Sequence, residues 1–132
     1  MSKLPWVVAG VALVALAVVV TRPRAGIAAG HPDPRPGITA ERVLPPAKVP
    51  AGAGTLEAYE AARRVPQVLD GLYCHCDCSK SIGHRSLITC FETDHGAYCD
   101  ICMDEAMLAA KMAGSRNSLI EIRKAIDAQF GS

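Results

Sequence analysis

The stretch YCHCDC at residues 73–78 decides how this fold is held together, because it places Cys74, Cys76 and Cys78 at alternate positions. A disulfide between cysteines two residues apart closes a small, strained ring, so we expect none within the motif. A turning backbone instead presents several sulfur atoms to one metal ion. The motif therefore favours a thiolate metal site.

A second motif, CDIC at residues 99–102, adds two cysteines at the predicted start of a helix. Cysteines at positions i and i+3 face the same way, and the helix dipole lowers the pKa of thiols at a helix N-terminus. Two thiolate groups that converge in space are more typical of a metal site than of a random set of disulfides. We therefore predict metal ligation by the cysteines of both motifs: Cys74, Cys76, Cys78, Cys99 and Cys102.

The remaining cysteine and the histidines supply further candidates. Cys90 lies in the apolar stretch LITCF, where it either joins the site or packs in the core as a small apolar side chain. His84 and His95 are candidate metal ligands. His75 is expected to point away from its cysteine neighbours in an extended loop, and His31, in a proline-rich segment, is expected to be exposed to solvent.

Met103 and Met107 form a stripe on the helix that the CDIC motif begins. Thioether sulfur is a soft ligand that suits copper. A methionine stripe at helical spacing belongs to a hydrophobic core more often than to a metal site, so we expect core packing.

Apolar periodicity after residue 54 predicts a mostly α-helical, cysteine-rich domain of about four short helices over residues 55–132. No segment shows the alternation typical of a strand. A domain this small has a thin core and commonly needs a metal or disulfides for stability. Thr55 is expected to cap the first helix, and the others are expected to begin near His84, near Cys99 and near Ser118. The last is expected to be capped by Ser115 or Asn117.

The N-terminal part has a different composition. Residues 6–20, WVVAGVALVALAVVV, carry no charge and resemble a signal-peptide core. We expect residues 1–21 to be an export segment, either removed or kept as a membrane anchor that tethers the chain through residues 5–20. Residues 22–54 hold seven of the nine prolines and predict a semi-rigid linker. The expected location is therefore periplasmic or at the cell surface.

Charge and motif content exclude several functional classes. The formal net charge is +1, so nothing in the overall balance favours nucleic-acid binding. The sequence contains no nucleophile elbow, phosphate-cradling loop or nucleotide fingerprint. We expect no enzymatic activity, with thiol redox chemistry as the minor exception.

The ordered set of motifs resembles the bacterial family of exported proteins named for a PCYCGC motif. The resemblance rests on YCHCDC at 73–78, GHRSLITCF at 83–91, HGAYCDICMDEA at 95–106 and SLIEIRKAID at 118–127. The chain departs from the pattern in lacking the proline before the first cysteine and in placing Asp77 where the motif has glycine. It also lacks the lipid-bearing cysteine of many members. The resemblance implies a fold and a location rather than an activity, because the family is largely uncharacterised.

Three functions stay open on sequence grounds. The first is a carrier, buffer or sensor for a soft ion, Cu(I) or Zn(II), with copper slightly favoured and with a membrane-associated metal donor or acceptor as partner. The second is a metal-free domain crosslinked by disulfides between the CxCxC cysteines and Cys90, Cys99 and Cys102. The third is a thiol-disulfide oxidoreductase that uses Cys99 and Cys102.

Overall fold

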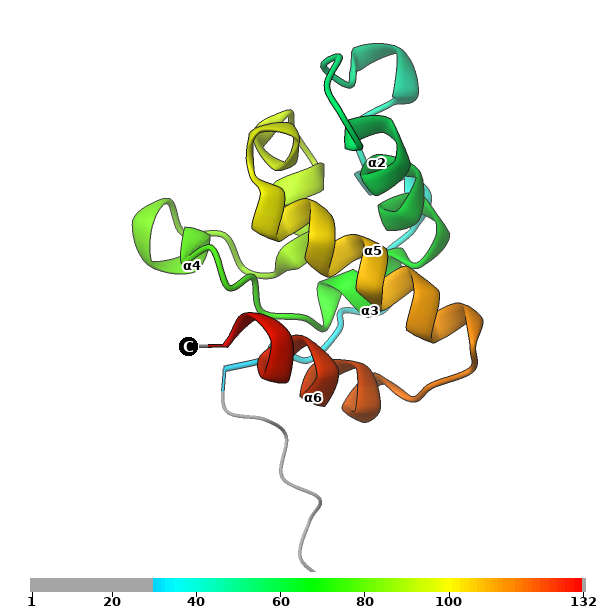
Figure 1. Ribbon diagram of the computed structural model, residues 1–132, viewed down its shortest axis with the longest axis vertical. Helices are drawn as coiled ribbons and strands as arrows, with labels where there is room; N and C mark the ends of the chain where they lie inside the picture. Colours follow the sequence, from blue (N-terminus) through cyan, green and yellow to red (C-terminus); the bar gives the residue numbers. More distant parts are fainter. Residues whose placement is uncertain (1–29, 132) are drawn as a thin grey trace, which may run out of the picture.

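The computed structural model describes residues 30–131, so the expectations for residues 1–21 and 22–29 lie outside the described part (Figure 1). The described chain is mostly helical and contains no strand between residues 30 and 131, as the sequence predicts. None of the helices in this part is both long and apolar enough to cross a membrane.

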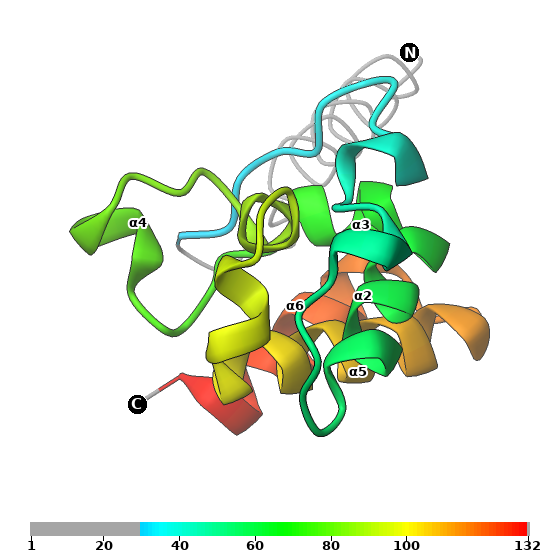
Figure 2. The same cartoon turned by 90° about the horizontal axis from the view of Figure 1, so that it is seen from above.

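Helix α5 (Asp100–Gly114) lies between helix α2 (Thr55–Arg64) and helix α6 (Leu119–Phe130), as both views show (Figures 1 and 2). Its buried face carries Cys102, Ala106 and Ala109. Small side chains let a neighbouring helix approach closely, and α2 buries alanines of its own. The small side chains of both helices therefore allow α2 and α5 to pack closely.

Helix α2 is fixed to the cysteine-bearing half of the domain through an aromatic pair. Tyr59 packs edge-on against Phe91, with ring centroids 4.9 Å apart, and donates a hydrogen bond to the Thr93 carbonyl at 2.7 Å. The expectation that Thr55 caps this helix is wrong: Thr55 is its first residue, and the capping position is Gly54, whose φ of 73° suits glycine. The Thr55 hydroxyl instead donates to carbonyl groups of the preceding turn.

Two further helices, α3 (Pro66–Asp70) and α6, pack against α5. Helix α3 begins at the proline that interrupts α2. Helix α6 is capped by Ser118, whose hydroxyl accepts from the Glu121 N–H while Glu121 accepts from the Ser118 N–H. The expectation that Ser115 or Asn117 caps this helix is wrong, because Ser118 supplies the complete capping box.

The segment between α3 and α5 is made of short turns. Helix α4 (Cys78–Ser81) and its flanking loops stand to one side of the domain in both views (Figures 1 and 2). The 3-10 helices η3 (Leu87–Phe91) and η4 (His95–Tyr98) follow. The helix expected near His84 is therefore a shorter 3-10 turn that begins at Leu87.

Residues 30–54 pack along the helices, so the predicted linker character does not hold for this part of the chain. The segment contains the 3-10 helices η1 (Ala40–Arg42) and η2 (Pro46–Lys48). Val43 is buried in the core, and the Leu44 N–H donates to the Phe91 carbonyl at 2.8 Å. His31 is buried, which makes the expectation of an exposed side chain wrong.

A buried carboxylate fastens this segment to the helices. Asp70 accepts a hydrogen bond from the backbone N–H of Arg35 at 2.6 Å. It also forms an ion pair with the Arg35 guanidinium at 2.7 Å. Arg85 and Ser86 also donate to Asp70, each at 3.1 Å. Burial raises the pKa of Asp70, but the hydrogen bonds from Arg35 and Ser86 outweigh it and hold the pKa below its ordinary value.

Candidate metal centre

The CxCxC loop leaves α3 and turns sharply at Asp77, which has φ 61° and ψ 21° and precedes α4. A residue other than glycine in this left-handed region is uncommon, and aspartate is among those that tolerate it. The Asp77 carboxylate is held by the Tyr73 hydroxyl and the Lys80 ammonium, each at 2.9 Å. This turn brings Cys78 back towards Cys74.

Five cysteine sulfurs converge at the base of this loop, all within 4.8 Å of one another. Cys74 Sγ lies 3.2 Å from Cys76 Sγ and 3.4 Å from Cys102 Sγ, and the last two sulfurs are 3.5 Å apart. Four of the five cysteines are buried, and Cys76 is partly exposed. The residues of this sulfur cluster are Cys74, Cys76, Cys78, Cys90 and Cys102.

A second group of donor atoms adjoins the sulfur cluster. It contains Cys78, His84, Cys90 and His95, whose donor atoms also lie within 4.8 Å of one another. His95 Nε2 is 3.1 Å from Cys78 Sγ, and His84 Nδ1 is 3.2 Å from Cys90 Sγ. The structure therefore places both predicted histidines, and Cys90, with the cysteines of the first motif.

Cys76 and Cys78 are joined by a disulfide. The expectation that cysteines two apart do not pair is therefore wrong, because the left-handed turn at Asp77 between them brings the two sulfurs together. The other described cysteines are free: Cys74, Cys90, Cys99 and Cys102. No disulfide links the CxCxC motif to Cys90, Cys99 or Cys102 within residues 30–131.

Cys99 belongs to neither group of donor atoms, although the sequence predicts it as a ligand. Its sulfur accepts a hydrogen bond from the Cys102 N–H at 3.4 Å and caps the N-terminus of α5. The i, i+3 spacing is compatible with this cap because the side chain of the capping residue turns back onto the first helical turn. Cys102, within the helix, faces the cluster instead.

The free thiols of the sulfur cluster differ in pKa, because each one changes the pKa of its neighbours. Hydrogen bonds from the Cys102 and Cys90 thiols lower the pKa of Cys74 to about 3, against the opposing effect of burial. The Cys74 thiolate in turn raises the pKa of Cys102. The prediction that the helix dipole lowers the pKa of Cys102 is therefore wrong in this environment, where the neighbouring thiolate dominates.

Two acidic side chains that the sequence did not single out, Glu105 and Asp127, hold His75 and His31 beside the CxCxC loop. Glu105 is fully buried, and its Oε1 accepts the His75 N–H at 3.0 Å and lies 2.5 Å from His75 Nδ1. His75 Nε2 and His31 Nε2 both contact Asp127 Oδ1, at 3.1 and 2.9 Å. His75 therefore positions the loop that carries Cys74 and is in neither group of donors.

The sulfur cluster also affects the pKa of Glu105. Burial raises the pKa of Glu105 to about 10, and the negative charge of Cys74 adds to this effect. Glu105 lies at i+3 from Cys102, so helical spacing places it on the face that points at the sulfur atoms. The i, i+3 spacing from Cys102 could have identified Glu105 in the sequence as a neighbour of the sulfur cluster.

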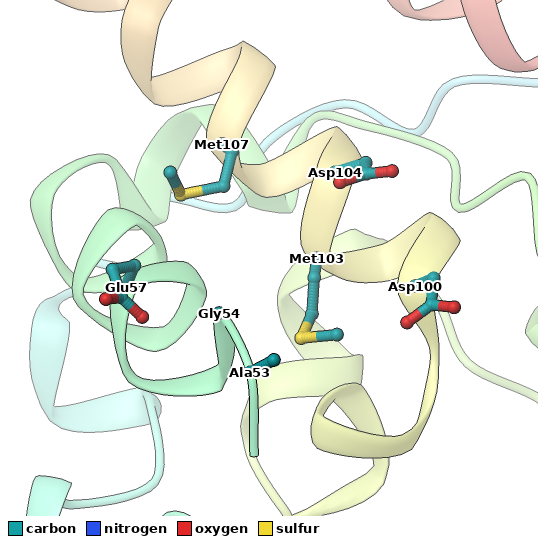
Figure 3. Close-up of a pocket in the computed structure, with 7 residues that line it drawn as sticks. All are labelled: Ala53, Gly54, Glu57, Asp100, Met103, Asp104 and Met107. Atoms are coloured by element: carbon teal, nitrogen blue, oxygen red, sulfur yellow. The ribbon is translucent and has the colours of Figure 1, made fainter.

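The methionine stripe lies on a different side of α5. Met103 and Met107 line an open hollow of about 450 Å³ together with Glu57 of α2, the turn before α2, and Asp100 and Asp104 of α5 (Figure 3). Met103 packs against the core as expected. Met107 is 43% exposed, so the expectation of core packing is wrong for this residue.

The donor set fits a soft metal ion. Cysteine sulfur and histidine nitrogen are both ligands of soft metal ions. The same sulfurs are close enough to form disulfides, as Cys76 and Cys78 do. The cluster is therefore capable of binding metal when reduced and of forming disulfides when oxidised.

Comparison with known proteins identifies a family model that matches residues 40–132, described as a protein of unknown function with PCYCGC motif. The match covers the described domain from η1 onward and includes every donor in both groups. No curated protein and no solved structure matches the chain.

Proposed function

We propose that this chain, which belongs to the PCYCGC family, binds a soft metal ion through its buried sulfur cluster and acts as a carrier, buffer or sensor for that ion. The observation that supports the proposal most strongly is the convergence of five sulfurs within 4.8 Å. Disulfide crosslinks join cysteines in separate pairs and do not require five sulfurs to meet at one point. A shared metal ion does require several donor atoms to converge, typically four for a tetrahedral ion.

The position of the cluster supports a structural role for the ion as well. The cluster joins the CxCxC loop, η3 and the first turn of α5, three segments that have little regular structure between them. Binding free energy at such a site adds directly to folding free energy, because the unfolded chain has no preformed site. We therefore expect the ion to order the loop from Cys74 to Cys90.

The identity of the ion and the location of the protein are part of the proposal. Cu(I) and Zn(II) both suit the donors, and the number of cysteines favoured copper slightly at the level of sequence. An exported protein with this site would exchange its ion with a membrane-associated donor or acceptor. The partly exposed Cys76 is the donor through which an incoming ligand would first reach the cluster.

The metal-free crosslinked domain and the thiol-disulfide oxidoreductase are less favoured. The first requires three long-range pairs, whereas the disulfide present lies within the CxCxC motif. The second requires Cys99 and Cys102 to pair, whereas Cys99 caps α5 and Cys102 faces Cys74.

Native mass spectrometry of the full chain tests the proposal. The chain is reduced with a phosphine, exchanged into chelator-free buffer and titrated with Zn(II) or Cu(I). We expect bound metal in the wild type and loss of tight binding in the Cys78→Ser/Cys90→Ser variant, which removes two donors from each group.

The matched control is Cys99→Ser, which removes a nearby thiol but keeps a side chain that caps α5. We expect this variant to bind as the wild type does. A reduced wild-type chain that retains no metal would refute the proposed function.

A further inference from the structure

Two donor atoms belong to both groups at the metal centre. Cys78 and Cys90 lie within 4.8 Å of the other sulfurs, and they also lie within 4.8 Å of the nitrogens of His84 and His95. We propose that the centre holds two metal ions, with the Cys78 and Cys90 thiolates bridging them. This inference rests on the proposed function and adds a second ion with two sulfur and two nitrogen ligands.

The distances around the second position are slightly shorter than those around a bound tetrahedral ion. An ion bound at about 2.0 Å to nitrogen and about 2.3 Å to sulfur holds its ligand atoms roughly 3.3–3.8 Å apart. The observed separations are 3.1 Å between Cys78 and His95 and 3.2 Å between Cys90 and His84. One ring nitrogen of each histidine lies within 4.8 Å of both the Cys78 and the Cys90 sulfur, so the four donor atoms surround one position. Small outward movements of the side chains admit an ion there.

The number of donors favours two ions over one. The two groups together contain seven different donors, whereas a tetrahedral site uses four. If Cys78 and Cys90 bridge, Cys74 and Cys102 complete the first position, and His84 and His95 complete the second. Cys76 then stands beside the first position as a further, more exposed sulfur.

Charge balance favours divalent ions in both positions. Four thiolates, at Cys74, Cys78, Cys90 and Cys102, carry four negative charges in a buried environment. Burying net charge is strongly unfavourable, and a single divalent ion would leave two negative charges uncompensated. Two divalent ions with neutral histidines make the centre neutral. We therefore assign Zn(II), or a divalent ion of similar preference, to both positions.

The disulfide between Cys76 and Cys78 excludes this two-metal state, because a disulfide sulfur is not a thiolate. A dithiol reductant restores it: the S–S bond breaks, two electrons and two protons pass from the dithiol to the two sulfurs, and the dithiol closes its own disulfide. Metal binding then displaces the thiol protons into solvent. The Cys76–Cys78 disulfide and the two-metal state are therefore mutually exclusive.

Native mass spectrometry of the reduced, zinc-titrated full chain separates this inference from the proposed function. We expect two zinc ions in the wild type, and one in His84→Ala/His95→Ala, which keeps every cysteine. One ion in the wild type would overturn the two-metal inference and leave the proposed function standing. No ion would overturn both. Two ions in the histidine variant would overturn the second position.

Cadmium-113 NMR of the wild type, with cadmium in place of zinc, tests the bridging without any substitution. We expect two resonances split by coupling between the two cadmium nuclei through the shared sulfurs. Two resonances without such coupling would show separate ions and overturn the bridging by Cys78 and Cys90.

Discussion

At residue scale, the turn at Asp77 explains how a CxCxC motif becomes a cluster of sulfurs. Its φ of 61° reverses the chain between Cys76 and Cys78, at the position where the family motif carries glycine. Glycine adopts this conformation without steric cost, whereas a side chain with a Cβ is disfavoured there. The motif therefore specifies a backbone conformation as well as three sulfurs.

We predict that Asp77→Gly is more stable than Asp77→Ala by about 1 kcal/mol. Both variants lose the contacts of the Asp77 carboxylate with Tyr73 and Lys80, so their difference isolates the backbone conformation. Denaturant unfolding of the two variants, each reduced and metal-free, measures it. Equal free energies of unfolding would contradict the left-handed turn.

The side chains that gather in the two donor groups were predictable from residue type, but their grouping was not. The cysteine motifs identified Cys74, Cys76, Cys78 and Cys102, and proximity in the sequence identified His84 and His95. Cys99 was assigned to the site because spacing alone does not distinguish a ligand at a helix start from the capping residue. His31 was missed because a proline-rich composition does not reveal a partner such as Asp127.

At the scale of elements, α5 connects the metal centre to the rest of the core. Cys102 and Glu105 on its first two turns face the sulfur cluster, and Ala106 and Ala109 face the other helices. Long, periodic helices such as α5 and α6 were predictable because their apolar spacing extends over several turns. The 3-10 turns η3 and η4 carry Cys90 and His95 but are too short to leave a periodic signal.

We predict that Ala106→Leu lowers the free energy of unfolding by about 1–3 kcal/mol, because added methylenes overfill a packed interface. Ala106 is fully buried, in the helix that packs against α2 and α6. Thermal or denaturant unfolding measures the change. Ala128→Leu, on the exposed side of α6, is the matched control and is expected to change stability by less than about 0.5 kcal/mol. An effect no larger than that of the control would contradict the close packing.

At the scale of the whole molecule, residues 30–54 close the domain by wrapping back onto the helices. Asp70 is the main anchor, because it binds Arg35 of this segment as well as Arg85 and Ser86 of the loop before η3. The sequence predicted a linker here from its prolines. Prolines also suit an extended segment that packs against a surface, and composition does not separate the two cases.

We predict that Asp70→Asn destabilises the protein by about 1–3 kcal/mol at pH 7, because the buried side chain loses its charge-assisted hydrogen bonds from Arg35 and Arg85, whose guanidinium groups are partly exposed. The pKa of Asp70 is lowered in the folded protein, so its stabilising effect is present above the unfolded value of 3.8 and is lost as the pH falls through the folded value. The difference from the wild type should therefore narrow below about pH 4. Urea unfolding of both proteins at a series of pH values measures it, and a constant difference would contradict the assignment.

The central claim is that the buried sulfurs hold a soft metal ion, and X-ray absorption at the zinc edge tests it most directly. The sample is the reduced full chain loaded with zinc and freed of excess ion. The account predicts a first shell dominated by sulfur at about 2.3 Å. A first shell of oxygen and nitrogen without sulfur would contradict it, because the ion would then lie outside the cluster formed by Cys74, Cys78, Cys90 and Cys102.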